Sequence, residues 1–315
     1  MIIKKFLFII LLFFLFFPYG KLLAQTSGQV ITISPLIFDL SVHPGEILKN
    51  TLRLYNPGQQ TLKVVMSVED FKAVGEEGSV EITQLEPEIE KIYSLTKWVE
   101  IKPSQFEISP REEKFVEFTI NVPIEAEPGG KYGALIANVG KIDTLEAGTG
   151  AMILQKVASL LLVSVSGPVE EKLLVREFKG PTFQEYGPIN FSLRLENLGT
   201  VHLRPRGTVA ITDWRNKKVA DLIIPQQVVM PKGRRIINIK WDKKNILGRF
   251  TATVVGSYGS TNEPFTAVWT FWVWPWKLSL AIFIAAILII YFFYRTRKRW
   301  LAALRILFKG ESTLN

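Results

Sequence analysis

The chain has 315 residues, no cysteine, two histidines and a formal net charge of +9. This charge comes from the two ends, because residues 1–24 carry three lysines and residues 272–315 carry seven basic side chains against one glutamate. The middle of the chain is neutral overall, which argues against nucleic-acid binding, and the lack of cysteine excludes a fold held together by disulfides.

Residues 1–24 have the pattern of a secretory signal peptide. Lys4 and Lys5 form a basic start, and Phe6–Phe17 is an apolar run of twelve residues. The stretch Leu22–Ala24 ends in the small residue that precedes a signal-peptidase cut. We predict a signal peptide that ends at Ala24, and the alternative is an anchor that stays on the protein.

Residues 25–169 are predicted to form a β-sandwich. Apolar and polar residues alternate in Thr51–Tyr55 and in Leu62–Glu69, with Pro57-Gly58 between them, so we predict a hairpin with one buried face. The alternation in Val116–Val122 indicates another strand, which ends at Pro123. Two further strand-like runs are Tyr132–Val139 and Leu160–Val165. Short strands without intervening helices are typical of a sandwich.

Two stretches of this domain interrupt the strand pattern. Residues 76–100 are rich in glutamate, with Gly78 near the start and Pro87 inside, and we interpret them as a long surface excursion that returns at Trp98. Residues 144–150 have the composition of a small-residue loop, and we predict that this loop is mobile.

Residues 170–271 are predicted to form a second sandwich, next to the membrane. Alternation in Ile189–Glu196 is followed by a turn at Asn197–Thr200, and later runs cover 237–241, 250–254 and 266–273. Residues 25–170 hold twelve basic and twenty acidic side chains, whereas residues 171–271 hold sixteen and eight. These opposite charges either orient the two domains towards each other or reflect two solvated surfaces of different composition.

Residues 272–294 are predicted to be a transmembrane helix. Leu278–Phe293 contains no charge, proline or glycine, and with its flanks it reaches the ~20 residues needed to cross a bilayer. Aromatic residues at one end of a span and basic residues at the other are typical of membrane interfaces. The predicted interface residues are Trp269, Trp272, Trp274 and Trp276 at the first end and Arg295, Arg297, Lys298 and Arg299 at the second. We therefore predict a single-pass membrane protein with the ectodomain outside the cell and the short basic tail, residues 295–315, in the cytoplasm. That tail either continues the helix or forms a separate amphipathic helix.

The sequence contains no recognisable combination of catalytic or metal-binding residues. His43 lies in a turn and His202 in a strand, one in each domain, with no carboxylate at metal-ligand spacing. Adjacent carboxylates such as Glu112 and Glu113 point to opposite sides of an extended chain. We predict that the protein is not an enzyme and that it has no cofactor and no metal site.

Aromatic side chains and sheet edges remain as candidate binding features. Trp98, Tyr132 and Trp214 are candidate contacts for a ligand or partner, because aromatic rings stack on sugars, and the alternative is that they are core residues. An antiparallel sandwich also exposes edge strands, which can pair with a strand of a partner.

Several stretches, taken in order, resemble the WxL-interacting surface protein family. The first domain carries Ile33–Pro35, Phe38–Leu40, Val42–Gly45 and Pro128–Gly133, and the second carries Glu196–Gly207 with its Asn-x-Gly-x-x-His-x-x-Pro-x-Gly pattern. The resemblance covers roughly residues 30–300 and includes the single C-terminal span. It implies two immunoglobulin-like domains on a membrane anchor, the first binding peptidoglycan and the second binding a partner or a host ligand.

These observations together favour a bacterial cell-surface adaptor. We expect its partners to be the lipid bilayer, peptidoglycan or another wall polymer, and an extracellular or cell-surface protein, but not nucleic acid. Two alternatives stay open. One is an envelope assembly chaperone that acts by β-strand complementation, and the other is a structural subunit of a surface complex.

Overall fold

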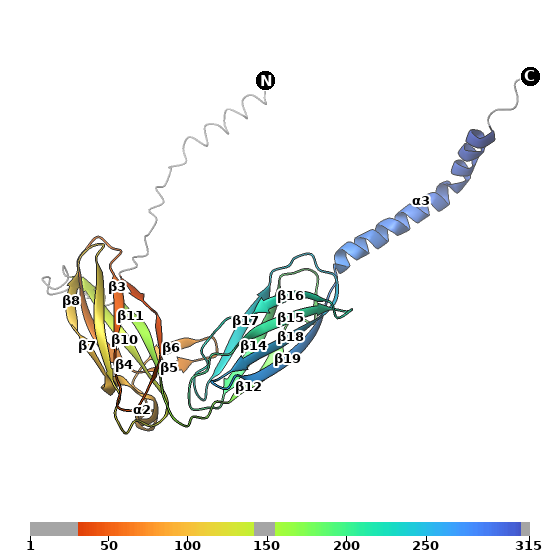
Figure 1. Ribbon diagram of the computed structural model, residues 1–315. Helices are drawn as coiled ribbons and strands as arrows, with labels where there is room; N and C mark the ends of the chain where they lie inside the picture. Colours follow the sequence, from red (N-terminus) through yellow and green to blue (C-terminus); the bar gives the residue numbers. More distant parts are fainter. Residues whose placement is uncertain (1–30, 142–154, 310–315) are drawn as a thin grey trace, which may run out of the picture.

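The computed structural model describes residues 31–141 and 155–309, which form two β-sandwiches followed by one long helix (Figure 1). We call the first sandwich, up to Val165, domain 1, and the second, from Leu173 to Val273, domain 2. The predicted all-β fold with two tandem immunoglobulin-like sandwiches is confirmed. The predicted signal peptide and the predicted loop at 144–150 lie outside the described residues.

Domain 1 packs a four-stranded sheet against a five-stranded sheet. The smaller sheet has the order β1 (Thr32–Ser34), β3 (Ile47–Tyr55), β9 (Glu113–Asn121) and β7 (Val99–Lys102). The larger sheet has the order β2 (Ile37–Val42), β11 (Gln155–Val165), β10 (Gly129–Lys141), β4 (Leu62–Glu69) and β8 (Gln105–Ile108). Within it, β2 pairs with β11 in parallel, whereas the other pairs are antiparallel.

The core of domain 1 follows the predicted alternation. Val116, Phe118 and Ile120 of β9 are buried, and the Phe118 ring meets Phe38 of the opposite sheet edge-on at 5.0 Å between centroids. Burial of such side chains is worth about 1.5–3 kcal/mol each before entropy is counted, so this face of the strand determines how the two sheets pack.

The predicted hairpin between β3 and β4 is wrong, because these strands belong to different sheets. β3 pairs with β1 and β9, whereas β4 pairs with β10 and β8. The alternation correctly identified one buried face for each strand. The two faces meet across the core, however, because the connecting turn at 56–61 crosses from one sheet to the other.

That turn is organised by a buried asparagine, and domain 2 repeats the device. Asn56 accepts a hydrogen bond from the Gly58 N–H at 2.9 Å and donates to the carbonyls of Gln60, Ile108 and Ser109 at 2.8, 3.1 and 3.0 Å. Asn197 accepts from the Gly199 N–H at 2.8 Å and donates to the carbonyls of Val201 and Val229 at 2.8 and 2.9 Å. Both asparagines are fully buried, so each holds a corner from the inside and satisfies carbonyls that are buried or partly buried.

Domain 2 is a sandwich of a three-stranded and a five-stranded sheet. The smaller sheet has the order β12 (Leu173–Lys179), β14 (Ile189–Asn197) and β17 (Arg234–Trp241). The larger sheet has the order β13 (Phe183–Gln184), β19 (Glu263–Val273), β18 (Gly248–Tyr258), β15 (Arg206–Asp213) and β16 (Lys218–Ile223). Its core includes Phe191, Trp241, Phe250 and Phe271, whose rings lie 5.5–6.4 Å apart where they meet.

The predicted surface excursion contains secondary structure and reaches domain 2. A two-stranded hairpin of β5 (Phe71–Val74) and β6 (Ser79–Ile82) precedes a short helix α2 (Pro87–Tyr93) and a 3₁₀ helix at Thr96–Trp98. Pro87 stands in the first turn of α2, where its missing N–H costs nothing. The hairpin projects from domain 1 towards domain 2 (Figure 1).

The C-terminal helix α3 runs without interruption from Trp276 to Lys309. Trp272 and Val273 still belong to β19, so the helix begins four residues after the predicted start. Of the two predictions for the basic tail, a continuation of the helix is the one observed, as far as Lys309. Residues Trp276–Arg297 are long and apolar enough to cross a membrane, with a mean hydropathy of 2.3. Trp269 is half-buried and donates from its indole to the Pro181 carbonyl at 3.2 Å, so it belongs to the body of domain 2.

We predict that Asn197→Ala destabilises domain 2 by roughly 2–3 kcal/mol, because the Gly199 N–H and two buried carbonyls lose their partner. Unfolding of the detergent-solubilised protein, followed through its tryptophan fluorescence, to which buried Trp241 contributes, measures the loss. The matched control is Asn245→Ala in an exposed loop. Equal stability of the two variants would contradict the role of the buried corner.

Candidate functional site

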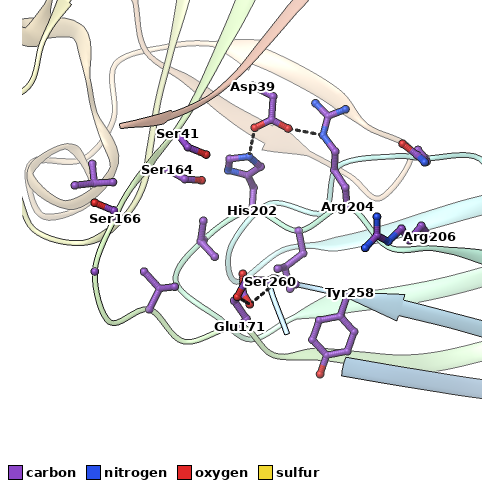
Figure 2. A pocket seen from close by; sticks show the side chains of 17 residues that line it. Asp39, Ser41, Ser164, Ser166, Glu171, His202, Arg204, Arg206, Tyr258 and Ser260 are labelled. Atoms are coloured by element: carbon purple, nitrogen blue, oxygen red, sulfur yellow. Dashed lines mark hydrogen bonds and ion pairs between the residues drawn. The ribbon is translucent and has the colours of Figure 1, made fainter. Parts of the chain in front are cut away.

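One carboxylate of domain 1 binds two basic side chains of domain 2. Asp39 lies in β2 between residues that face the core, so its own side chain points outwards. Its Oδ1 is 3.0 Å from Nε2 of His202, and its Oδ2 is 2.6 Å from Nε of Arg204 (Figure 2). Both oxygens are therefore used, and the bridge ties the edge strand of domain 1 to the segment before β15.

The hydroxyl of Tyr132 forms the next link of the same network. It accepts a hydrogen bond from the backbone N–H of His202 at 3.0 Å and lies 3.3 Å from Nδ1 of that imidazole. A neutral imidazole with its proton on Nε2 satisfies every contact, because Nδ1 then accepts from the hydroxyl and Nε2 donates to Asp39. Burial raises the pKa of Tyr132 well above its usual value, which keeps the hydroxyl protonated.

A glycine is required beside this tyrosine. A Cβ on Gly130 would lie 1.9 Å from the Tyr132 hydroxyl oxygen, so any other residue would displace the ring. The Gly130 N–H also donates to the Thr200 carbonyl at 3.1 Å, which adds a backbone link between the domains. The Gly-Gly-Lys-Tyr sequence at the start of β10 thus serves the contact between the domains.

The tip of the β5–β6 hairpin makes a second attachment to domain 2. The Glu76 carboxylate forms a bidentate ion pair with Arg194, in which Oε2 accepts from Nε at 2.6 Å. Its backbone carbonyl accepts from the Ile236 N–H at 2.7 Å, which occupies the edge of β17. Gly78 has φ +89°, and the Arg235 guanidinium fills the space where a Cβ would stand.

An apolar cluster lies between these two attachments. Phe71, Tyr132 and Leu162 of domain 1 are buried there, and Val228 and Met230 of domain 2 pack against them. Tyr93 of α2 stacks on Tyr132 at 6.0 Å between centroids. An apolar contact with a hydrogen-bonded charge cluster on either side resists both sliding and separation of the two domains. The two sandwiches are therefore held in one relative orientation.

A cleft of about 690 Å³ opens beside the Asp39 bridge. Its walls come from both domains, as Figure 2 shows. Domain 1 contributes Ser41 and Ser164, which face each other on paired strands, and domain 2 contributes Arg206, Tyr258 and Ser260. Glu171, from the connection between the domains, accepts hydrogen bonds from the Ser260 hydroxyl and N–H, both at 2.8 Å. The cleft is thus lined by hydroxyl groups and a guanidinium group.

The three aromatic residues singled out in the sequence lie in three different places. Tyr132 is buried between the domains, where it has no open face for a ligand. Trp98 is half-buried against the core of domain 1, and the Lys131 ammonium lies 5.7 Å from the centre of its ring. Trp214 is exposed over 66% of its surface, in the turn between β15 and β16.

The two histidines have polar partners that account for them. His43 Nδ1 lies 2.6 Å from the Ser166 hydroxyl, and His202 is held by Asp39 and Tyr132. Within residues 31–141 and 155–309, no cluster of three or more His, Asp or Glu residues is arranged to hold a metal ion. Both histidines thus serve contacts within the protein, and His202 belongs to the contact between the domains.

The sequence showed Asp39 and His202 only as parts of separate motifs and did not pair them. The signal that could have done so is the opposite net charge of the two halves, because Asp39–Arg204 and Glu76–Arg194 both join an acid of domain 1 to a base of domain 2.

No protein-family model matches this sequence, and no curated protein matches it. Among solved structures it is similar to the YadV chaperone, with 9% identity and a TM-score of 0.38 over 77% of this chain and 100% of that one. It is also similar to the class 5 fimbriae chaperone CfaA (10%, 0.38, 76% and 98%) and to a PapD-like domain of human CEP192 (14%, 0.32, 48% and 98%). These similarities are too low to carry an argument about function.

We predict that acid loosens the contact between the domains. The hydrogen bond from His202, assisted by Arg204, lowers the pKa of Asp39 below its ordinary value of 3.8. A carboxylate with a lowered pKa stabilises the folded contact above its unfolded pKa, and this contribution is lost as the pH falls through the lowered value. Because the chain has no cysteine, spin labels can be placed at Thr51→Cys and Asn245→Cys alone. The distribution of distances between these two labels should broaden below about pH 4.

The variant Asp39→Asn should show that broadening already at pH 6, because it cannot carry the charge. Glu107→Gln, on a carboxylate with no ion pair in the described part of the chain, is the matched control. A distance distribution in Asp39→Asn that is as narrow as that of the parent protein at pH 6 would contradict the role of this bridge.

Proposed function

We propose that the protein is a membrane-anchored, non-enzymatic adaptor of the cell surface, which holds an extended segment of a partner protein in the cleft between its two sandwiches. The observation that carries the proposal is the cleft itself. Its walls are contributed by both domains, and these domains are fixed to each other by charge, hydrogen bonds and apolar packing. A preformed site avoids the entropy cost of ordering two loose domains at the moment of binding.

The chemistry of the cleft suits a polypeptide. Hydroxyls of Ser41 and Ser164 accept and donate hydrogen bonds, as backbone amides require, and Arg206 offers a cation to a carboxylate. Tyr258 lines the same space and offers an apolar ring. Wall polymer is the other ligand expected from the family resemblance, and it would need exposed aromatic rings that stack on sugars. Of the three candidate rings, Trp214 alone is exposed, and it does not line the cleft.

Strand complementation, the alternative function, depends on an open sheet edge. The outer edge of β11 is covered by β2 along Leu160–Val165, which leaves Gln155–Ser159 as the uncovered part of that strand. A short free edge next to a covered one favours binding in the cleft over the exchange of a long strand. A chaperone role remains the second candidate because β8, β7 and β16 are also edge strands.

The proposed topology places both sandwiches outside the cell and the end of α3 in the cytoplasm. It rests on the apolar segment Trp276–Arg297 and on the basic residues that follow Tyr294. A membrane-impermeant maleimide should label a cysteine introduced at Thr51 in intact cells. The same reagent should label Ser312→Cys only after lysis. Labelling of Ser312→Cys in intact cells, with Thr51→Cys protected, would reverse the topology.

Photo-crosslinking in living cells tests the cleft. A photoreactive residue at Ser41, an exposed position in the cleft, should capture one defined surface protein, and Thr51, which is exposed on the outer face of β3, should not. Ser41→Trp should then reduce the yield at a second cleft position, Ser260, at least several-fold by filling the space. Thr51→Trp is the control of equal size.

Three results would overturn the cleft proposal. The first is equal capture at Ser41 and Thr51, which would mean that the reaction reports random collisions. The second is capture at β8 or β16 alone, which would favour the chaperone. The third is retention of the full-length protein on purified peptidoglycan with no protein captured, which would favour wall-polymer binding.

A further inference from the structure

The end of domain 2 that faces away from domain 1 is also the end where α3 begins (Figure 1). The strand register brings three loops to this end, because Gly248 pairs with Val273 and Asp213 pairs with Phe250. With the strand residues that flank them, these connections are 183–188, 213–218 and 242–249. Together with the junction 272–277 we call them the anchor end of domain 2.

Exposed aromatic and apolar side chains gather at the anchor end. Trp214 at 66% and Leu247 at 59% are the most open of them, and the others are Phe183, Tyr186, Trp272, Trp274 and Trp276. Soluble domains do not usually leave seven large apolar side chains open at one end. Four of the seven are Trp or Tyr outside the helix itself, and such rings favour the layer of lipid headgroups.

Basic side chains surround these aromatics. The anchor end carries seven cations, Arg215, Lys217, Lys218, Lys243, Lys244, Arg249 and Lys277, against the three carboxylates Glu185, Asp213 and Asp242. The Arg215 guanidinium lies 4.3 Å from the centre of the Trp214 ring, so a cation and an indole are presented together. The exposed Lys217, Lys243 and Lys244 make no ion pair in the part of the chain that the structure describes.

The opposite end of domain 2 differs in this respect. There Arg194 and Arg204 bind carboxylates of domain 1, and Arg176 and Arg234 both bind Glu196. These four arginines are thus used within the molecule, whereas Lys217, Lys243 and Lys244 at the anchor end remain available. This contrast separates a surface that is built for an outside anion from the general basic character of the domain.

The junction holds the anchor end close to where α3 leaves. The N–H groups of Trp272 and Trp274 donate to the carbonyls of Thr182 and Gln184 at 2.9 and 3.0 Å, which clamps the end of β19. Lys277, in the first turn of α3, lies 3.0 Å from the largely buried Glu185 carboxylate. Because Trp274 and Pro275 alone separate the strand from the helix, there is no linker that would let the domain swing away.

We propose that the anchor end of domain 2 is a lipid-docking face, which rests on the outer leaflet and binds anionic headgroups around the point where α3 enters the bilayer. The inference rests on the membrane anchoring proposed above. Its aromatic rings lie in the headgroup layer, and its unpaired lysines and arginines meet lipid phosphates. Domain 2 is then fixed to the membrane by a ring of loops as well as by the helix.

The test uses the full-length protein in vesicles, either of neutral phosphatidylcholine or with anionic phosphatidylglycerol added. A fluorophore on Asn245→Cys reports the loop at 242–249, and one on Thr261→Cys reports an exposed turn at the opposite end of domain 2. In anionic vesicles, quenching by acrylamide in the water should be several-fold weaker at Asn245→Cys than at Thr261→Cys. In neutral vesicles the difference should be smaller.

The cations are tested by removing two of them. Lys243→Gln with Lys244→Gln should raise the quenching at Asn245→Cys in anionic vesicles towards the neutral-vesicle value, without releasing the protein from the vesicles. Lys49→Gln with Lys63→Gln, two exposed lysines of domain 1, is the matched control and should change nothing. Trp214→Ala should likewise raise the quenching.

Two failures can be told apart. If the protein floats with the vesicles but acrylamide quenches both positions equally in anionic lipid, the docking face is wrong and the anchor stands. If the protein does not float with the vesicles, the anchor itself is wrong, and the docking proposal falls with it.

Discussion

The bridge from Asp39 to His202 and Arg204 is the constraint on which the rest of the arrangement depends. It ties the edge strand of one sandwich to the segment before β15 of the other, and Tyr132 and Glu76 extend the contact on either side. Without this bridge, the two domains that line the cleft would be less firmly held, and the width of the cleft would vary. Two sandwiches in one chain can be loosely or firmly joined, and these contacts join them firmly, as the proposed binding in the cleft requires.

The strands were largely predictable because their alternation records one buried face at each position. Their pairing was not, and the turn at 56–61 shows why. A Pro-Gly sequence indicates a reversal, but a reversal within a sheet and a crossing between sheets need the same local chemistry. The decision lies with Asn56, whose partners at 108 and 109 are distant in the chain. Contacts of that range leave no trace in a local pattern.

The candidate site was predictable in its parts and not in its assembly. Asp39 and the Gly-Gly-Lys-Tyr start of β10 stood out as motifs, and the opposite charges of the two halves were visible, but nothing in the sequence joined a residue at 39 to one at 202. The aromatics show the same limit. Tyr132 and Trp214 look alike in sequence, yet one closes the interface between the domains and the other stands at the far end of domain 2.

The route of β19 into α3 has a mechanical consequence. A pull on domain 1, away from α3, reaches that helix along β19, which is paired with β18 over eleven residues and with β13 in parallel at its last two. A load directed along a strand shears its ladder, so that many hydrogen bonds must rupture together instead of opening like a zip. In domain 2, such a load is thus carried by the full length of the β18–β19 ladder before it reaches α3.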